Sequence, residues 1–451
     1  MKIIIAGAGE VGKHLAKLLS REYQNCTLID DDEERLSSLD DYDIMTMLAS
    51  PTSVKALKEA GAHDADLFIG VTPDESRNMN SCILAHALGA KKTVARIDNY
   101  EYLAPNLEEF FKKMGIDSLI YPEVLAAADI NNGLRMSWVR QRWDVHNGAL
   151  VMLGVKLRKN CEILGQPLKD LCGPTDPYHI VAIKRNSETI IPGGNDMLQQ
   201  DDLAYFMTTE DYIPYIRTIS GKDHYTDVKN VIIMGGSKTA VRTALTTPEN
   251  MHVKIIEMSE KRCEQLNMLL SDVDTMVIHG DGRDTNLLIE EGIERAEAFV
   301  ALTGNAEANI LACLTAKRLG VPKTIAMVEN LDYVGMAEEL DIGTIINKKT
   351  IAAGHIYQMM LDADVTNMRS LMMVDSDVAE FVAAKGSPVT KKPVKDLRLP
   401  AGVTIGGLVR NNVGMLVNGN SQIEAGDSVM VFCHEHNLNK VEKYFKHHTL
   451  W

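Results

Sequence analysis

Long hydrophobic runs are missing from this 451-residue sequence, and no stretch approaches the ~18 consecutive apolar residues of a membrane span. Cations are also scarce, because 47 Lys and Arg face 62 Asp and Glu, a formal net charge of −15. Phosphate backbones and anionic lipids both attract clustered cations, so this charge argues against nucleic-acid binding and against adhesion to a lipid surface. Aromatic residues make up only 5%, which disfavours base-stacking platforms. We expect no nucleic-acid partner, and a membrane role only through a partner protein.

Cys-x-x-Cys spacing is absent as well, and the number of cysteines is odd, at seven. This pattern favours reduced, mostly buried thiols in a cytoplasmic protein over a disulfide framework. The apolar run at residues 3–6 is too short for a signal peptide, which agrees with that location. His434, Glu435 and His436 follow Cys433, and His447 and His448 lie near the end, but their spacing matches no tight zinc signature. We therefore expect no metal site.

The most informative feature that is present is an internal repeat. Residues 3–9, Ile-Ile-Ile-Ala-Gly-Ala-Gly, correspond to residues 231–237, Val-Ile-Ile-Met-Gly-Gly-Ser. Other matching pairs are Asn78 and Asn309, Cys82 and Cys313, Gly89 and Gly320, Arg185 and Arg410, and Asp202 and Asp427. The repeating unit is thus large and occurs twice in tandem, with the polar stretch at residues 220–227 as the hinge.

Each copy begins with short apolar runs that alternate with helical segments. In the first copy, strands are predicted at residues 2–6, 26–30, 44–48, 67–71, 93–97 and 118–121, with helices between them and a last helix at 124–138. Such alternation predicts a doubly wound parallel sheet with helices on both faces, a Rossmann-like α/β fold. Shorter strands follow and predict a small α+β lobe. The expected domains are residues 1–140, 144–225, 228–365 and 370–451.

The first candidate site is a glycine-rich turn between the opening strand and helix. It comprises Gly7, Ala8, Gly9, Glu10, Val11 and Gly12. In the dinucleotide-binding fingerprint the first glycine allows the turn, the second lets the backbone approach a pyrophosphate, and the third lets helix and strand pack closely. Asp30 stands 18 positions past the last glycine (30 − 12), where a carboxylate accepts hydrogen bonds from ribose hydroxyls and disfavours a 2′-phosphate. The pattern therefore predicts NAD(H) rather than NADP(H).

The second copy departs from this fingerprint. Its turn comprises Gly235, Gly236, Ser237, Lys238 and Thr239, and Glu257 is the acid. Ser237 places a side chain where the pyrophosphate would lie, whereas Lys238 offers a cation to a phosphate. A working pocket and a degenerate copy that only keeps the fold are both open from the sequence.

Further ligand contacts are expected from loops at the carboxyl ends of the strands. The candidates are Thr72, Pro73, Asp74, Arg96 and Asp98 in the first copy, and Thr303 and Gly304 in the second. Met327 replaces Arg96 in the second copy, which removes a cation that could meet a phosphate. For Arg96 itself, a ligand contact and a surface residue at a strand end are equally open.

With these motifs in place, the chain resembles the TrkA family, the regulatory subunits of Trk potassium-uptake systems, over nearly its whole length. The resemblance rests on the first glycine turn with Asp30, on Glu59-Ala60-Gly61-Ala62, and on Gly280-Asp281 and Gly320-Val321-Pro322. It implies two RCK (regulator of K⁺ conductance) modules that bind NAD(H) and ATP or ADP. It also implies a homo-oligomeric, tetrameric ring beneath a membrane potassium-translocating Trk subunit, on the cytoplasmic face of the inner membrane, that gates this partner. The Gly280-Asp281 pair has no counterpart in the first copy, where Ala49-Ser50 stands, so contacts that the family assigns to this acid are in doubt there.

Two alternatives remain: an NAD-dependent oxidoreductase, and an RCK-type regulator of another transporter. A dehydrogenase presents an acid or base to the nicotinamide from a substrate domain. The trailing lobes are small and carry no such constellation in the sequence. We therefore expect a binding protein rather than an enzyme.

Overall fold

The computed structural model describes residues 1–21, 25–39, 42, 44–146, 148–171, 177–186, 188–364, 368–373, 376–433 and 437–446. The chain divides into two compact units. The first comprises residues 1–126 and 347–364, and the second comprises residues 127–346 and 365–451.

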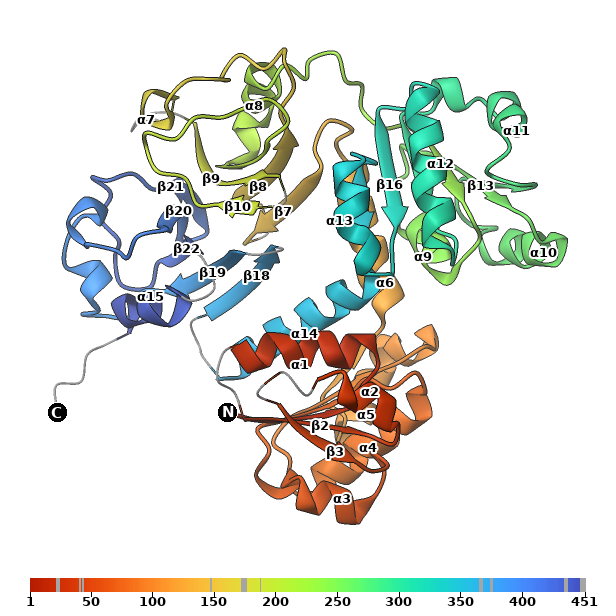
Figure 1. Cartoon of the computed structure of the whole chain (residues 1–451), viewed down its shortest axis with the longest axis vertical. Coiled ribbons are helices and arrows are strands. Elements are labelled where there is room, and N and C mark those ends of the chain that lie inside the picture. The colour runs from red at the N-terminus through yellow and green to blue at the C-terminus, as the bar shows by residue number, and fades with distance from the viewer. Residues whose placement is uncertain are drawn as a thin grey trace. The chain divides into compact units, whose positions relative to one another are not determined.

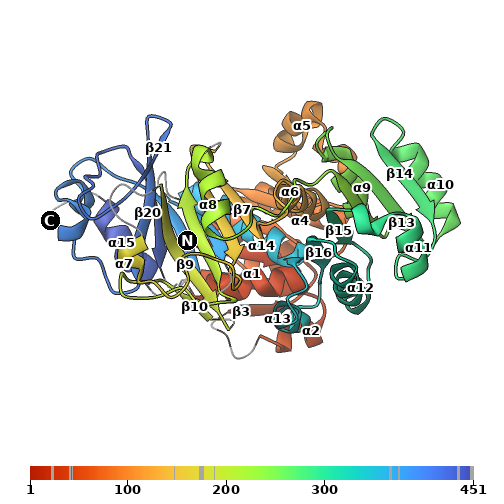
Figure 2. The same cartoon turned by 90° about the horizontal axis from the view of Figure 1, so that it is seen from above.

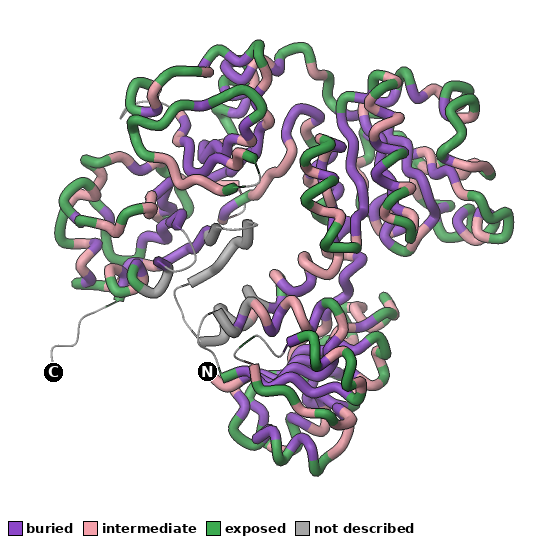
Figure 3. Tube along the Cα trace, viewed as in Figure 1, coloured by how far each residue is buried: buried purple, intermediate pink, exposed green. Residues whose placement is uncertain are grey.

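The first unit is built on a parallel sheet of six strands in the order β3-β2-β1-β4-β5-β6 (Figure 1). The strands are β1 (Lys2–Ala6), β2 (Asn25–Asp30), β3 (Met45–Leu48), β4 (Leu67–Gly70), β5 (Thr93–Arg96) and β6 (Ser118–Ile120). The helices are α1 (Glu10–Arg21), α2 (Glu33–Ser37), α3 (Val54–Glu59), α4 (Glu75–Leu88) and α5 (Glu108–Lys113). β1 is central and its Ile3, Ile4 and Ile5 are fully buried, because helices cover both faces of the sheet. Figure 3 shows the central strands of this sheet as buried, whereas the edge strand β3 is mostly exposed.

The second unit repeats this sheet with the order β14-β13-β12-β15-β16-β17. Its strands are β12 (Asn230–Met234), β13 (His252–Glu257), β14 (Thr275–His279), β15 (Ala298–Ala301), β16 (Lys323–Met327) and β17 (Thr344–Ile346). Its helices are α9 (Lys238–Thr246), α10 (Glu260–Leu269), α11 (Thr285–Glu290), α12 (Ala306–Arg318) and α13 (Asp332–Glu339). In both sheets the strand order reverses beside the first strand, so the glycine turn lies at the switch point where such folds bind ligands.

Two antiparallel lobes complete the second unit. The first has the order β10-β9-β11-β8-β7, with β7 (Gln141–Val145), β8 (Leu150–Lys156), β9 (Tyr178–Arg185), β10 (Glu188–Ile190) and β11 (Leu203–Thr208), and with α7 (Leu168–Leu171) and α8 (Ile213–Ile219). The second has the order β18-β19-β22-β20-β21, with β18 (Met368–Met373), β19 (Ser376–Val382), β20 (Val403–Arg410), β21 (Val413–Leu416) and β22 (Ser428–Cys433), and with α15 (Leu438–Phe445). Figures 1 and 2 show β9 and β20 as neighbours.

Each lobe contains an equivalent arginine–aspartate ion pair, formed by residues that the internal repeat aligned. Arg185 Nε and Nη2 donate to the carboxylate of Asp202 at 2.8 and 2.7 Å, and Arg410 makes the same two bonds to Asp427 at the same distances. Both carboxylates are buried. The predicted fold class, two doubly wound parallel sheets each followed by a small α+β lobe, is confirmed.

The last helix of each parallel-sheet domain joins the other copy. α6 (Pro122–Leu134) begins in the first unit, and its residues from 127 onward belong to the second, where Asn131 Nδ2 donates to Thr243 O of α9 at 3.2 Å. α14 (Lys348–Asp364) belongs to the first unit and lies along α1 (Figure 1). The sequence predicted the first of these helices at residues 124–138 and marked it for exchange or packing between subunits. Within this chain, α6 contacts the second copy, and its packing between subunits stays a prediction.

The described cysteines, Cys26, Cys82, Cys161, Cys263, Cys313 and Cys433, are free and buried, as the sequence predicted. Burial raises the pKa of both Cys82 and Cys313 to about 12. These two thiols donate to equivalent carbonyls, of Val94 and Ile325. They act as small packed side chains rather than as reactive groups. Cys172 lies outside the described residues.

Candidate functional site

The three glycines of the first turn do different work. Gly7 has a φ of +116°, and a Cβ there would lie 2.7 Å from Thr72 N. A Cβ on Gly12 would lie 1.9 Å from Gly7 O. Both positions therefore need glycine for the turn to keep this conformation without strain.

Gly9 is the exception, because a Cβ on it would meet no atom of the chain within 4 Å and its φ lies outside the left-handed region. The fold does not require glycine at this position. The space beside Gly9 lies at the N-terminus of α1, where amide groups and the helix dipole favour an anion. Glu10 is exposed and Val11 buried at the start of the same helix.

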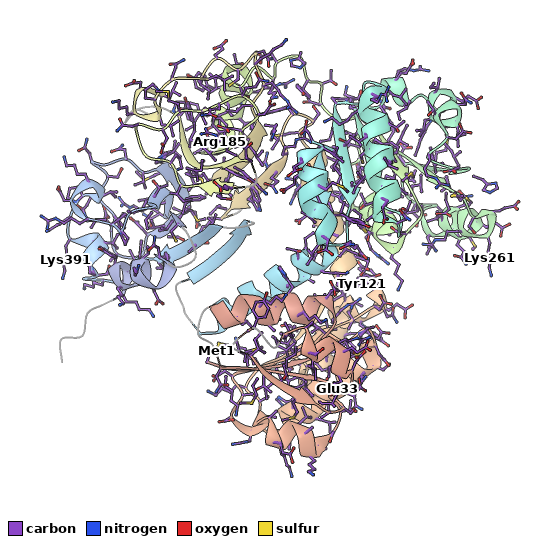
Figure 4. All side chains as sticks on the ribbon, in the orientation of Figure 1. Met1, Glu33, Tyr121, Arg185, Lys261 and Lys391 are labelled. Carbon is purple, nitrogen blue, oxygen red and sulfur yellow. The ribbon has the colours of Figure 1, made fainter. Side chains whose placement is uncertain are left out.

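Asp30 holds this turn in place. Its Oδ2 accepts from Ala8 N at 2.5 Å and its Oδ1 from Asp32 N at 3.0 Å. The carboxylate is buried at the end of β2, and the guanidinium of Arg35 lies 3.9 Å from it. Each carboxylate oxygen keeps a further lone pair for a ligand hydroxyl. Figure 4 labels Glu33, which opens α2 just beyond this point.

The buried side-chain amide of Asn78 connects the carboxyl ends of β4 and β5. Asn78 Oδ1 accepts from the Thr72 amide and hydroxyl, both at 2.7 Å, while its Nδ2 donates to Thr72 O and to Arg96 O, both at 2.9 Å. The loop after β4 is thereby tied to the end of β5. The internal repeat paired Asn78 with Asn309 but indicated no role at the site for either.

The remaining first-copy candidates lie at the same edge of the sheet. Asp74 caps α4 by accepting from Ser76 N and Arg77 N, and Pro73 beside it is exposed. Asp98 is exposed, and its amide donates to Glu75 Oε2 at 2.7 Å. The Arg96 side chain is half-buried, and no ion pair joins it to another described residue.

Arg77 is a charged residue at this edge that the sequence interpretation missed. Its Nη2 lies 2.5 Å from Asp31 Oδ2, at the end of β2, and 3.4 Å from Ser50 Oγ, beyond β3. The hydrogen bond from Arg77 lowers the pKa of the Asp31 carboxyl. The sequence could have indicated Arg77, because it lies in the first turn of α4, and that turn faces the carboxyl ends of the strands.

Side chains of the second copy make hydrogen bonds around the second glycine turn. Ser237 occupies the position of Gly9 and caps α9 by accepting from Ala240 N at 3.3 Å. Arg262 Nε donates to Gly236 O at 2.8 Å. Glu257 behaves as Asp30 does, since Oε2 accepts from Gly236 N at 2.7 Å and Oε1 from Ser259 N at 2.8 Å. The Ser237 side chain therefore occupies the position beside which the first copy has open space, and Arg262 binds the backbone of the same turn.

The other second-copy candidates follow the first copy's plan. Thr303 N and Oγ1 donate to Asn309 Oδ1 at 3.2 and 2.6 Å, and Gly304 is exposed. Lys238 is exposed and Thr239 buried in the first turn of α9. Asp281 pairs with Arg283 two residues away, and no carboxylate stands at its equivalent, Ser50.

The second arginine that the sequence interpretation missed, Arg262, had a signal in the repeat. Arg35 follows Asp30 by five residues (35 − 30), and Arg262 follows Glu257 by five (262 − 257). Both guanidinium groups approach their turn or its acid in the structure. The equal spacing marks a repeated cation next to each glycine turn.

Metal-ligand clusters and membrane spans are both absent from the part of the chain that the structure describes. No three or more His, Cys, Asp or Glu side chains gather there in a group that could hold a metal ion. His434, Glu435, His436, His447 and His448 lie outside the described residues. No described helix combines the length and the apolar character that crossing a bilayer requires.

Comparison with known proteins places these features in one family. The model of the TrkA-N domain matches residues 3–122 and 231–348, and that of the TrkA-C domain matches residues 378–446. The Trk system potassium uptake protein TrkA of Haemophilus influenzae is 32% identical, with 99% of each chain covered. That of Azorhizobium caulinodans is 30% identical, also with 99% of each covered.

Solved structures show the same fold. The GsuK RCK domain aligns with a TM-score of 0.59 and 14% identity, covering 98% of this chain and 94% of that one. A GsuK channel bound to NAD aligns with a TM-score of 0.58 and 13% identity, covering 98% of this chain and 78% of that one. Two matches to the TrkA-N model, together with full-length relatives at 30% and 32% identity, establish the relationship. The chain belongs to the TrkA family of Trk system potassium uptake proteins.

Proposed function

We propose that this chain is the nucleotide-binding regulatory subunit of a Trk-type potassium uptake system and that it gates a membrane K⁺-translocating subunit. The first glycine turn is the site that senses NAD(H), and ATP or ADP competes for it. The observation that carries the proposal is the open space beside Gly9 at the N-terminus of α1. Family membership supplies the biological setting.

The ligand's orientation follows from the site. The pyrophosphate lies against the Gly9 backbone, where the first turn of α1 offers amide donors. The adenosine ribose reaches Asp30, whose oxygens keep acceptor capacity. A 2′-phosphate would meet this buried carboxylate, so NADH is preferred over NADPH. Arg96 and Arg77 lie at the same edge of the sheet as cations for the rest of the dinucleotide.

Gating requires no chemistry on the ligand. A nucleotide that binds one conformation of the protein better than another shifts the equilibrium between them. A tenfold preference amounts to about 1.4 kcal/mol per site, and equivalent sites in a tetrameric ring add. We propose that such a ring sits at the cytoplasmic face of the inner membrane, attached only through its partner, and that the chain is not an enzyme.

The test is potassium flux through the partner subunit in proteoliposomes, with this chain added at varied NADH. We expect NADH to change the flux with the unaltered chain and to leave it unchanged with Gly9→Val. The control is Gly335→Val, because a Cβ on Gly335 would likewise meet no atom within 4 Å, and this glycine lies in α13 rather than in either glycine turn. A flux that responds to NADH equally in both variants would contradict the proposal.

The oxidoreductase alternative has its own test. The chain is incubated with NAD⁺ and a broad panel of alcohols and hydroxy acids, and NADH absorbance is followed. We expect no sustained NADH production, and turnover with any member of the panel would overturn the regulatory assignment.

A further inference from the structure

A second concentration of charge lies within the second unit and includes no residue of either glycine turn. Its cations come from the segment before β7, from the first lobe, and from α12 and β16 of the second parallel sheet. They are Arg140, Lys156, Arg158, Lys222, Lys317 and Lys323. The acids among them are Asp341, in the turn after α13, and Asp201, beside β11.

Asp341 is shared by three of these cations. Arg140 Nη2 donates to its Oδ1 at 2.8 Å, Lys317 Nζ lies 3.1 Å from its Oδ2, and Arg158 Nη2 donates to the same Oδ2. Arg158 Nη1 also reaches Asp201 at 2.5 Å. Although burial raises it, the pKa of Asp341 falls to about 2 because of these cations. One carboxylate therefore serves three positive groups.

Two lysines of the cluster are buried without a carboxylate. Lys323 is 1% exposed, and its Nζ donates to Val139 O at 2.5 Å and Thr344 Oγ1 at 3.1 Å, both neutral acceptors. Lys222 is 3% exposed, and its Nζ lies 5.3 Å from the centre of the Tyr225 ring. Within the described part of the chain, no carboxylate lies at ion-pair distance from the Lys222 Nζ. Burial lowers the pKa of Lys222 to about 8.

The cluster is therefore under-compensated. Burial lowers the pKa of Lys323 well below its ordinary value, so its amine is counted as neutral. The other five cations face two acids, an excess of three positive charges (5 − 2) in a chain whose net charge is −15. Removing charges from water without partners is expensive, so such an excess is stable where an anion completes it. The ion-pair network within the chain does not account for Lys222 or Lys156.

The cluster can be reached from solvent at Arg158 and Lys317. The side chains of Arg158 and Lys317 are about one-third exposed. Next to Lys222, an open hollow of about 650 Å³ is lined by Tyr225, whose ring centre lies 5.3 Å from the Lys222 Nζ, and by Gly320 and Pro322 after α12. None of the six basic residues lines this hollow itself. His224 and Arg295 also line this hollow, together with Glu294 and Glu297 on the wall formed before β15.

We propose that this cation cluster is a second ligand site of the protein, which binds a multiply charged phosphate anion such as a polyphosphate chain or the phosphates of a nucleotide. Guanidinium groups bind phosphate oxygens through paired hydrogen bonds, and lysines add point charges. The phosphates lie against Lys222, Arg158 and Lys317, and any attached organic group lies in the hollow beside Tyr225. The site joins the first lobe to the second parallel sheet, so its occupant holds these two parts together.

The probe is inorganic tripolyphosphate, titrated calorimetrically into the full chain. We expect saturable binding that weakens as salt is raised. Lys222→Met should lower the affinity about tenfold or more, because one charge-assisted contact is lost. Lys261→Met, which removes an exposed lysine of α10, should leave it unchanged.

Two readouts separate a ligand site from a structural network. Lys222→Met should keep or raise the thermal stability of the ligand-free chain, because it replaces an uncompensated buried charge by an apolar side chain. Binding at a pH above about 8 should take up a proton, since an anion restores the charge of Lys222, which Arg158, Arg140, Asp341 and Cys161 face from the neighbouring elements. Lys156→Met is the second variant should Lys222→Met fail to fold.

The source of the phosphate is decided by parallel titrations. Tripolyphosphate and ATP that bind alike indicate recognition of the phosphate chain alone, whereas tighter ATP binding indicates that the hollow holds the nucleoside. Binding that survives Gly9→Val but is lost in Lys222→Met belongs to this site and is independent of the proposed dinucleotide site. No tripolyphosphate binding to the unaltered chain, or binding unaffected by Lys222→Met and Lys156→Met alike, would overturn the proposal.

Discussion

At the scale of residues, the glycines of the first turn fall into two kinds. Two of them are required by the backbone conformation, and the third leaves space for a ligand. The spacing alone predicted roles for Gly7, Gly9 and Gly12, and the structure shows close backbone contacts at Gly7 and Gly12 and open space at Gly9. The sequence could not reveal that Asp30 binds the Ala8 amide, because that bond depends on how the turn directs its N–H. Asp30 was predicted to contact ribose, and its bond to the turn is a second role that only the structure reveals.

Replacing each of the three glycines with alanine should have different effects on the stability of the first unit. Gly7→Ala and Gly12→Ala should each destabilise the first unit by about 2 kcal/mol or more, because the new Cβ would overlap backbone atoms. Gly9→Ala should leave its stability unchanged. Hydrogen–deuterium exchange of β1 and β4 in the full chain is the measurement. Equal protection in all three variants would show that the turn relaxes freely.

Asp30→Ala should do two things at once. NADH affinity should fall about tenfold, the loss of a charged hydrogen-bond pair, and the turn should become more mobile because the Ala8 amide loses its partner. Calorimetric titration with NADH measures the first effect and amide exchange at Ala8 the second. Glu257→Ala is the matched control, since it frees the Gly236 amide in the second copy and should leave NADH affinity unchanged. Loss of NADH binding in that control would place the ligand in the second copy instead.

At the scale of elements, the sequence predicted the strands, most helices and the duplication. It placed the last helix of the first copy at residues 124–138, whereas α6 ends at Leu134. Periodicity shows that a helix has a buried face but not which domain covers it, so the partners of α6 and α14 could not be derived. The same limit applies to Asn78, whose four bonds connect residues up to 18 positions apart.

The packing of α14 on α1 should matter to ligand binding. Ile356 is 1% exposed in α14, so Ile356→Asp buries a charge and should destabilise the first unit by about 3 kcal/mol or more. Because α1 carries the N-terminus beside Gly9, NADH affinity should fall too. Thermal unfolding and NADH titration are the measurements, with the exposed His355→Ala on the same helix as the control. Unchanged binding in a destabilised Ile356→Asp would separate α14 from the site.

At the scale of the whole molecule, stability depends on contacts between residues that are distant in sequence. Arg140 and Asp341 are 201 positions apart and lie in the segment before the first lobe and after α13. No local pattern in the sequence singles out Asp341, and for this reason the cation cluster was not predicted. Ion pairs in the cluster, such as that of Arg158 with Asp341, join the first lobe to the second parallel-sheet domain.

This arrangement predicts a specific acid sensitivity. The folded-state pKa of Asp341 is about 2, below the ordinary carboxyl value, so its ion pairs contribute stability above pH ~4 that is lost as the pH falls toward 2. The difference amounts to about 2 kcal/mol. Urea unfolding between pH 5 and 2 should show this loss in the unaltered chain and a flatter profile in Asp341→Asn. Identical profiles would show that the carboxylate titrates normally.

The central claim is that the first glycine turn, and not the second, holds a dinucleotide whose occupancy the protein senses. Calorimetric titration of the full chain with NADH, alongside Gly9→Val and the control Gly335→Val, tests it most directly. The account predicts one NADH per chain, unchanged in Gly335→Val and abolished in Gly9→Val without loss of fold. NADH that binds Gly9→Val as tightly as the unaltered chain would contradict it.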